Sequence, residues 1–316
     1  MKYWFAEAPS NIALIKYMGK TDHSQNLPTN PSLSYTLPNL LSYVELRPFA
    51  GSQDYWEPLE IPGYKILKLQ AKAQERFLNH LNMLKEYFNY EGHFLVRSAN
   101  NFPLGSGLAS SASSFAALTK CACIALSELT NQEIPNEFVQ AQLSRLGSGS
   151  SCRSFFSPWA LWENDYCEKI DLPYDHLIHH VIIVNDNEKE ISSKQAHLAV
   201  QSSPDFRFRP QRAKERLKDL IEAFKALSWQ RAYEICWDEF MDMHHLFETA
   251  SQPFRYITPQ SQKALDDLKA FWATHQDGPL ITMDAGPNIH LLFRPDQKEL
   301  ARFYIQEYLV NQFDFL

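Results

Sequence analysis

The sequence has few glycines, few cysteines and no long apolar run. Its 316 residues include 10 glycines and 5 cysteines, with 45% hydrophobic and 21% charged residues. This composition is that of a folded globular protein, and it excludes a collagen-like or low-complexity chain. No apolar run approaches the ~20 residues needed to cross a membrane, and the N-terminal residues lack the basic flank and apolar core of a signal peptide. We therefore expect a cytoplasmic protein with no membrane partner.

An excess of positive charge is also absent. The formal net charge is -7, whereas broad electrostatic binding to nucleic acid requires a basic face. We therefore expect no nucleic-acid partner. A phosphorylated small molecule remains compatible with this charge, because a few local cations and main-chain amides suffice to bind a phosphate.

The cysteines and histidines do not follow a metal-binding pattern. The cysteines are odd in number and lack CxxC spacing, so we expect reduced, buried thiols rather than a zinc site. The doublets His179-His180 and His244-His245 each direct adjacent side chains to different faces of a strand or helix. A doublet is therefore a poor chelate, and we expect no metal site built by protein side chains.

Strand-like and helix-like segments are mixed along the chain without regular alternation, which favours an α+β fold over a doubly wound sheet. The patterns predict strands at residues 13–19, 32–37, 42–49, 92–99, 160–165, 179–186, 279–285 and 289–295. They predict helices at about 65–90, 107–129, 135–146, 210–227, 229–247, 258–274 and 296–313. The length suits two domains, which we place at residues 1–180 and 181–316.

Two of the ten glycines, Gly105 and Gly107, lie within the stretch NNFPLGSGLASSAS. They fall where a predicted strand turns into a predicted helix, and free main-chain N–H groups at a helix N-terminus bind anions. Hydroxyls for phosphate oxygens, or for a magnesium ion carried by them, are available from Ser106, Ser110 and Ser111. An ordinary serine-capped helix packed on a sheet stays an alternative, because the lysine of the GxxxxGK[ST] phosphate loop is absent.

Charged residues in three other segments are candidates for a reactive centre. Arg153, between a cysteine and an aromatic pair, is expected to be partly buried and to need an anion. Asp284 ends a strand-like run before a Gly-Pro turn, so it either forms the turn or, beside Arg153, belongs to an acid-base pair. Lys16 and Lys20 share one face of an extended segment, so they are either two solvated lysines or ligands of one polyanion.

Taken together, these segments resemble the diphosphomevalonate decarboxylases of the GHMP kinase superfamily. The resemblance spans Ala8 to about Phe293 and rests on APSNIALIKYMGK, NLPTNPSLSYTL, SANNFPLGSGLASSAS, SRLGSGSSCRS, ISSK, MHHLFETASQPFRY and MDAGPN. It implies an α+β, two-domain GHMP kinase-like fold. The N-terminal domain would be a mixed α/β, ATP-binding domain, the C-terminal domain would be ferredoxin-like α+β, and the assembly would be a homodimer.

The resemblance also implies an activity that uses ATP and Mg²⁺. The 3-hydroxyl of mevalonate 5-diphosphate would be phosphorylated, and loss of phosphate and CO₂ would then give isopentenyl diphosphate. Asp284 would lie next to that hydroxyl, Arg153 would be its partner and bind the substrate carboxylate, and Lys16 would complete the charged centre. The implied substrate contacts are Tyr17, Lys20, Arg145, Ser150, Ser192 and Ser193. The implied ATP contacts are Asn101, Pro103, Gly105, Ser106, Gly107, Ser110 and Ser111, with magnesium carried by ATP and Ser110 as its candidate protein contact.

The sequence departs from the family's usual pattern at four places. Met18 replaces a tryptophan, Pro31 replaces a serine, and Leu104-Gly105-Ser106 replaces Thr-Ala-Ala. Lys194 stands where bacterial members often carry arginine, which keeps the charge but loses the bidentate fork for a diphosphate.

Three alternatives to this activity follow from the same residues. A phosphomevalonate decarboxylase or a mevalonate 3-kinase would share most of the motifs, and the presence of Lys20 and Arg145 favours the diphosphate substrate. A non-catalytic metabolite sensor is disfavoured, because such a protein would not need Asp284 together with Arg153.

Overall fold

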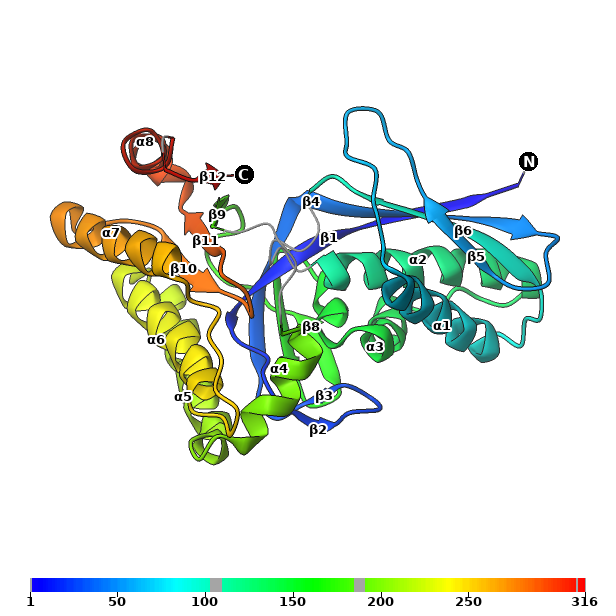
Figure 1. Ribbon diagram of the computed structural model, residues 1–316, viewed down its shortest axis with the longest axis horizontal. Coiled ribbons are helices and arrows are strands. Elements are labelled where there is room, and N and C mark those ends of the chain that lie inside the picture. Colours follow the sequence, from blue (N-terminus) through cyan, green and yellow to red (C-terminus); the bar gives the residue numbers. More distant parts are fainter. Residues whose placement is uncertain (1, 103–109, 185–190, 311, 316) are drawn as a thin grey trace.

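The computed structural model describes residues 2–102, 110–184, 191–310 and 312–315. Two β-sheets, each covered by helices, lie side by side along the longest axis of the molecule (Figure 1). The first sheet has the order β5-β6-β4-β7-β8, with β1 also paired to β4, and only β5 and β6 run parallel. Its strands are β1 (Trp4–Ile15), β4 (Ser32–Phe49), β5 (Tyr55–Pro58), β6 (His93–Asn100), β7 (Trp159–Glu163) and β8 (Tyr166–Lys169).

Helices cover one face of the first sheet and supply its core (Figure 1). They are α1 (Ala71–Tyr87), α2 (Ser110–Thr130), α3 (Glu137–Gly147) and the 3₁₀ helix η1 (Gly149–Phe155). By length and composition α2 could cross a membrane, but most of it is buried inside the protein, and it contacts both β1 and β4. It is the central core helix of this half.

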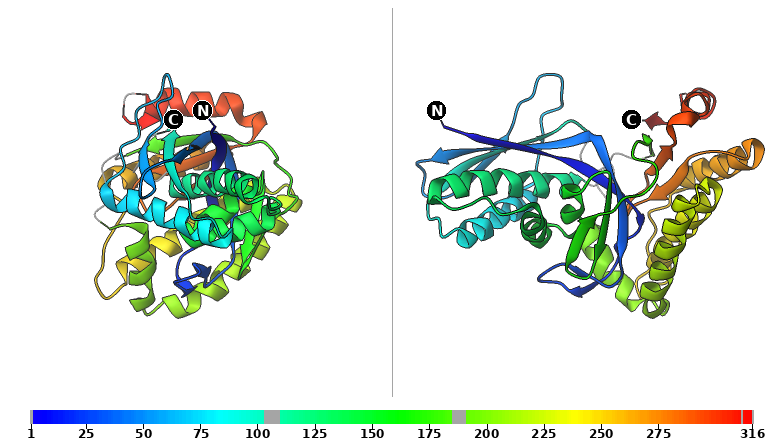
Figure 2. Two further views of the ribbon diagram at one scale, coloured as in Figure 1. Left: turned by 90° about the vertical axis from the view of Figure 1, so that its right-hand side faces the viewer. Right: turned by 180° about the vertical axis from the view of Figure 1, so that it is seen from behind.

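The second sheet has the antiparallel order β10-β11-β9-β12. Its strands are β9 (Ile178–Ile183), β10 (Leu280–Met283), β11 (Ile289–Phe293) and β12 (Asp314–Phe315). The helices of this half are α4 (Ser193–Ala199), α5 (Arg209–Lys225), α6 (Trp229–Glu248), α7 (Pro259–His275) and α8 (Lys298–Tyr304). Short turns complete it at η2 (Val200–Ser202), η3 (Phe206–Phe208), η4 (Pro295–Gln297) and the π turn η5 (Ile305–Leu309). Figure 2 shows α5, α6 and α7 stacked as a layer away from the first sheet.

Strands β1 and β4 belong to both hydrophobic cores. Ala8 and Val44 pack in the core under α1 and α2, whereas Ile12, Leu33 and the neighbouring Trp159 pack with α5, α6 and α7. The two strands therefore contribute side chains to both cores, and we call β1 and β4 together the spine. The small hairpin of β2 (Lys20–Asp22) and β3 (Leu27–Pro28) projects from this spine (Figure 1).

The predicted α+β class is confirmed, but three strand predictions are wrong in detail. Segments 32–37 and 42–49 form the single strand β4, because Asn101 bonds the main chain where they join, accepting from the N–H of Leu41 and donating to the carbonyl of Asn39. Strand β1 begins at Trp4 and ends at Ile15, and β5 was not predicted. The predicted domain boundary at residue 180 falls within β9. This strand belongs to the second sheet, and the last strand of the first sheet, β8, ends at Lys169.

Candidate active site

A cavity of about 760 Å³ opens where the two halves meet. Its wall is built from the end of β1, the β2 hairpin, α1, the first turn of α2, the α3–η1 junction, α4 and the turn after β10. Among the described residues, five lysine or arginine side chains line it, against one aspartate. In a chain with a formal charge of -7, this concentration of cations marks a site for a polyanion.

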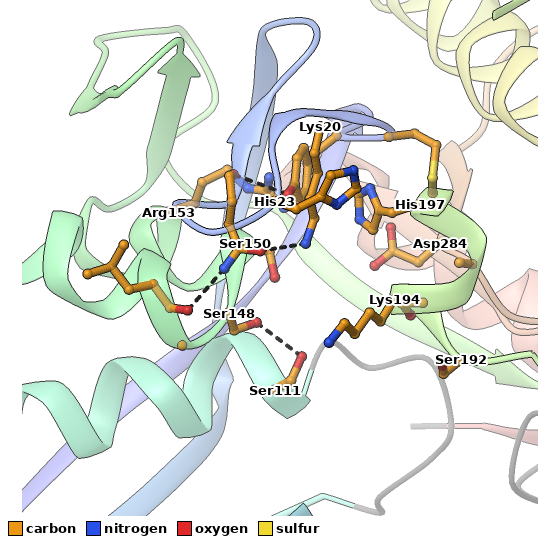
Figure 3. A pocket seen from close by; sticks show the side chains of 18 of the residues that line it. Lys20, His23, Ser111, Ser148, Ser150, Arg153, Ser192, Lys194, His197 and Asp284 are labelled. Carbon is orange, nitrogen blue, oxygen red and sulfur yellow. Dashed lines mark hydrogen bonds between the residues drawn. The ribbon is translucent and has the colours of Figure 1, made fainter. Parts of the chain in front are cut away.

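Asp284 and Lys16 form an ion pair on the cavity wall. Lys16 Nζ lies 2.7 Å from Asp284 Oδ1, and the lysine side chain is 2% exposed whereas the aspartate is 29% exposed and faces the cavity (Figure 3). Burial acts to raise the pKa of the Asp284 carboxyl, but the charges of Lys16, His290 and Arg153 outweigh it and hold that pKa below its usual value. Burial lowers the pKa of Lys16, and Asp284 opposes that shift. The aspartate is therefore an ionised acceptor at neutral pH.

Arg153 reaches the same cavity from η1. Its guanidinium donates to Asn11 Oδ1 and to Ser32 Oγ, both at 3.1 Å, and it is almost fully buried. Both partners are neutral, and among the described residues no carboxylate forms an ion pair with it. The predicted pairing with Asp284 is thus corrected: the direct contact comes from Lys16, and Arg153 acts on the carboxylate at longer range. Its charge is left for an anion in the cavity.

The segment from Tyr17 to Lys20 carries three more cavity residues, but residues 16–19 are not a strand, and Lys20 begins β2. Because β1 ends at Ile15 and Gly19 has φ +91°, the prediction that Lys16 and Lys20 share one face of an extended segment is wrong. Both lysines nevertheless line the cavity. The Tyr17 ring lies 4.4 Å from that of His197, whose Nδ1 accepts a hydrogen bond from the Gly19 N–H at 3.0 Å.

His197 was missed at the sequence level. Burial, together with the charges of Lys20, His23 and Arg153, lowers its pKa to about 3, so it is neutral at physiological pH and joins α4 to the β1–β2 loop. A single histidine in a helical pattern carries no sequence signal for such a position.

Arg76, from α1, was also missed. Its Nη2 donates to the carbonyl of Gly147 at 2.6 Å, its guanidinium lies 4.7 Å from the Phe115 ring centroid, and burial lowers its pKa. Lys20 lies close to it: burial, Arg76 and Lys194 lower the pKa of Lys20 to about 8. We call Lys20, Arg76 and Lys194 the cation cluster. Within the described parts of the chain, none of the three forms a salt bridge with a carboxylate, so the cluster is arranged to receive an anion.

The predicted serine contacts fall on the cavity wall. Those within the described residues are Ser110, Ser111, Ser150, Ser192 and Ser193, of which Figure 3 labels Ser111, Ser150 and Ser192. The Ser192 hydroxyl also caps α4, accepting from the Gln195 N–H and donating to the Gln195 side chain. The Ser193 hydroxyl has no such role in the capping box, so these two serines differ in how free their side chains are to bind a ligand.

Two predicted contacts do not lie on the cavity wall. Arg145 donates through Nε to the carbonyl of Gln25 and through Nη1 to that of Asp165, at 3.2 and 2.7 Å. Asn101 bonds the main chain of β4 as described above. This geometry gives no support to a direct ligand contact by either residue: Arg145 holds the β2–β3 turn beside the cavity, and Asn101 holds the middle of β4. The predictions for Pro103, Gly105, Ser106 and Gly107 lie outside the described residues.

The donor set suits a magnesium ion that arrives with a nucleotide. In the described part of the chain no three His, Cys, Asp or Glu side chains are grouped to hold a metal ion. Mg²⁺ is commonly held by substrate phosphates, waters and one or two protein oxygens, and Ser110 and Ser111 present hydroxyl oxygens at the start of α2. All five cysteines are buried and free, as predicted.

Comparisons with known proteins find the same family in both halves of the chain. Residues 8–170 match the family described as the diphosphomevalonate decarboxylase-like N-terminal domain, and residues 179–314 match the mevalonate 5-diphosphate decarboxylase C-terminal domain. A crystal structure of a mevalonate diphosphate decarboxylase from Legionella pneumophila is 57% identical, with a TM-score of 0.95 and full coverage of both chains.

Two further relatives agree. The structure of MDDEF in complex with MVAPP, AMPPCP and magnesium is 29% identical, with a TM-score of 0.86 and coverage of 99% of this chain and 95% of that one. The diphosphomevalonate decarboxylase of Schizosaccharomyces pombe is 30% identical over 93% of this chain and 79% of its own length. The order of the motifs, the two-sheet fold and the cation-lined cavity agree with these likenesses, and the chain belongs to the diphosphomevalonate decarboxylase family.

Proposed function

We propose that this protein catalyses the ATP-dependent decarboxylation of mevalonate 5-diphosphate to isopentenyl diphosphate, with release of ADP, phosphate and CO₂. The single observation that carries the proposal is the cavity in which, among the residues that the structure describes, one ionised aspartate faces five lysine and arginine side chains. The substrate has a tertiary alcohol that Asp284 would orient, a carboxylate that Arg153 would bind and a diphosphate tail that the cation cluster would bind.

The nucleotide would supply the phosphoryl group, with Mg²⁺ neutralising its charge, and the Ser110 and Ser111 hydroxyls at the start of α2 would contact the phosphate oxygens. Phosphoryl transfer depends mainly on positioning and charge neutralisation, so the chain needs no strong base. Asp284 fits this requirement, since Lys16 keeps its carboxylate ionised and weakly basic. It would orient the 3-hydroxyl and accept its proton late in the transfer.

Arg153 would hold the substrate carboxylate until it leaves as CO₂. Its guanidinium is fixed by Asn11 and Ser32 and has no direct carboxylate partner among the described residues, so a ligand carboxylate can pair with it bidentately. Departure of the 3-phosphate leaves a carbocation-like centre, and the fixed carboxylate of Asp284 would stabilise it electrostatically.

The cation cluster would bind the diphosphate tail. Lys20, Arg76 and Lys194 come from three separate elements, and after the larger effect of burial the charges of Arg76 and Lys194 lower the pKa of Lys20. A diphosphate relieves that repulsion. Three cations suit a diphosphate better than a monophosphate, which favours decarboxylation of the diphosphate over the phosphomevalonate alternative.

The experiment offers ATP and Mg²⁺ with either mevalonate 5-phosphate or mevalonate 5-diphosphate, and measures ADP and CO₂ together. Equal release of both products with the diphosphate alone is the expected result. Release with the monophosphate would identify a phosphomevalonate decarboxylase, and ADP without CO₂ would identify a 3-kinase.

We also propose, on the family resemblance, that the protein acts as a cytoplasmic homodimer. Sedimentation velocity of the purified chain measures the assembly state, and a monomer at all protein concentrations would contradict it. Fractionation of the source cells tests the location.

A further inference from the structure

The main chain of Lys16 is held by side chains from the opposite half of the molecule. Its N–H donates to Glu239 Oε1 of α6 at 2.9 Å, and its carbonyl accepts from Arg209 Nη2 of α5 at 3.3 Å. Asn30 Nδ2 donates to the same carbonyl at 2.9 Å. Both main-chain polar groups of a residue just past the end of β1 are thus bound by side chains, where a strand partner would ordinarily bind them.

Glu239 and Arg209 form a bidentate ion pair that is wholly buried. Arg209 Nη1 donates to Glu239 Oε2 at 2.8 Å, Nη2 donates to Oε1, and both side chains are 0% exposed. The pair continues into a network with Asp242, Arg212 and Arg216 at the α5–α6 interface. We call these five residues the paired network.

Burial of such a pair needs a reason other than stability. Desolvating two charges can cost as much as their attraction returns, so a buried ion pair is weak evidence of stabilisation. Here the same carboxylate that pairs with Arg209 also binds the main chain of the lysine whose ammonium meets Asp284. A hydrophobic pair at these positions would fill the space but could not bind that main chain.

We propose, on the basis of the activity proposed above, that Glu239 and Arg209 are positioning residues: they fix the end of β1 so that the Lys16 ammonium is held against Asp284. The negative charge of Glu239 also acts on Lys16 and favours its protonated form. They touch neither substrate nor nucleotide. Their effect on turnover passes through Lys16.

The charged and titratable groups that act on Lys16 come from every neighbouring element. They are Asp284 after β10, Arg153 of η1, Glu239 and Cys236 of α6, and Arg209 of α5. Asp284 and Glu239 raise the pKa of Lys16, whereas Arg153 lowers it. Removing the Glu239 charge therefore makes Lys16 lose its proton at lower pH.

The test compares Glu239→Gln with Asp242→Asn in the full-length protein. Both remove one carboxylate charge from Arg209 and Arg216, but in the described part of the chain no hydrogen bond or ion pair joins Asp242 to Lys16. We expect Glu239→Gln to lower kcat about 100-fold, the size of loss that follows a small misplacement of a catalytic group. KM for the diphosphate should change little, and Asp242→Asn should keep kcat within about 3-fold of the wild type.

A second variant, Glu239→Asp, separates position from charge. It keeps the negative charge but retracts the carboxylate by one methylene from the Lys16 N–H. We expect a loss of kcat with the alkaline limb of the profile of kcat against pH, which reports the enzyme–substrate complex, unmoved, whereas Glu239→Gln should move that limb to lower pH. The titration of Lys16 itself, followed by NMR on ¹⁵N-lysine-labelled protein with Lys16→Arg for assignment, measures the same shift without turnover.

Each outcome bears on the proposal in a different way. Equal loss of kcat in Glu239→Gln and Asp242→Asn, or no loss in either, would overturn it. Failure of both Glu239 variants to fold would also overturn it, because the pair would then serve the fold. Absence of product from the wild type contradicts the proposed function instead, and an unshifted Lys16 titration in Glu239→Gln contradicts the positioning proposal alone.

Discussion

Two groups of basic side chains lie on either side of Lys16, and they differ in their partners. The paired network places Arg209, Arg212 and Arg216 against Glu239 and Asp242. The cation cluster of Lys20, Arg76 and Lys194 has, in the described ranges, no acidic partner. Cations that build a protein are neutralised by the protein, whereas cations that bind a ligand are left for the ligand to neutralise. The missing acids therefore mark the binding site.

The largest effect is expected from Asp284, the one acid that the described residues place on the cavity wall. Asp284→Ala should lower kcat about 1,000-fold or more, because it removes both the orienting acceptor of the hydroxyl and the counter-charge of Lys16. ATP affinity, measured by calorimetry, should stay within a few-fold. A large loss of ATP affinity would show that Asp284 serves the nucleotide site instead.

The paired network should respond in stability. Arg209→Met leaves the buried Glu239 carboxylate short of its main partner, and breaking a buried pair costs about 3–5 kcal/mol. Urea unfolding of this variant measures the loss. The matched change in the cation cluster, Arg76→Met, removes a cation without an acid partner among the described residues. It loses only the bond to the Gly147 carbonyl and the contact with the Phe115 ring, so it should lower the unfolding free energy by no more than about 1–2 kcal/mol. Equal losses in the two variants would erase the distinction between the groups.

The cation cluster should respond in substrate affinity. Arg76→Met should raise KM for the diphosphate about 10- to 100-fold, the range expected when one hydrogen bond to a charged group is lost, with a smaller effect on the monophosphate. Arg212→Met, in the paired network, is the control and should leave KM unaltered. A change in KM for ATP in place of the diphosphate would reassign Arg76 to the nucleotide.

The smallest effect concerns pH. Burial, Arg76 and Lys194 lower the pKa of Lys20 to about 8, and its protonated form is the one that binds an anion. Since kcat/KM reports the free enzyme, it should fall as pH rises through about 8, and Lys20→Arg should move that fall to higher pH. An alkaline limb that stays in place in Lys20→Arg would assign it to another group.

The reactive residues of the site could be predicted from the sequence, whereas a residue of the cation cluster could not. Asp284, Arg153 and Lys16 lie in short motifs whose residue types suit one reaction, and all three line the cavity. Arg76 lies in a helix among other charged residues, where only the packing of α1 against Gly147 and Phe115 reveals that it points inward. A residue of this kind has no local signal, because its position depends on tertiary contacts.

For Arg145 and β4, a local pattern led to a prediction that the structure does not support. A motif placed Arg145 near the ligand, yet its guanidinium bonds the carbonyls of Gln25 and Asp165. Pro38-Asn39 looks like a turn between two strands, but the Asn101 amide satisfies the main chain there and the strand continues. Both differences arise from contacts between residues about 20 to 120 positions apart, which local patterns do not record.

The spine formed by β1 and β4 has a consequence for dissecting the molecule. Ile12, Leu33 and Trp159 precede any cut near residue 180, yet their side chains fill the core under α5, α6 and α7. A fragment ending there would expose them to water, and the remainder would lack part of its own interior. The halves are therefore expected to melt in one cooperative transition, and neither should be recoverable as a stable fragment when expressed separately.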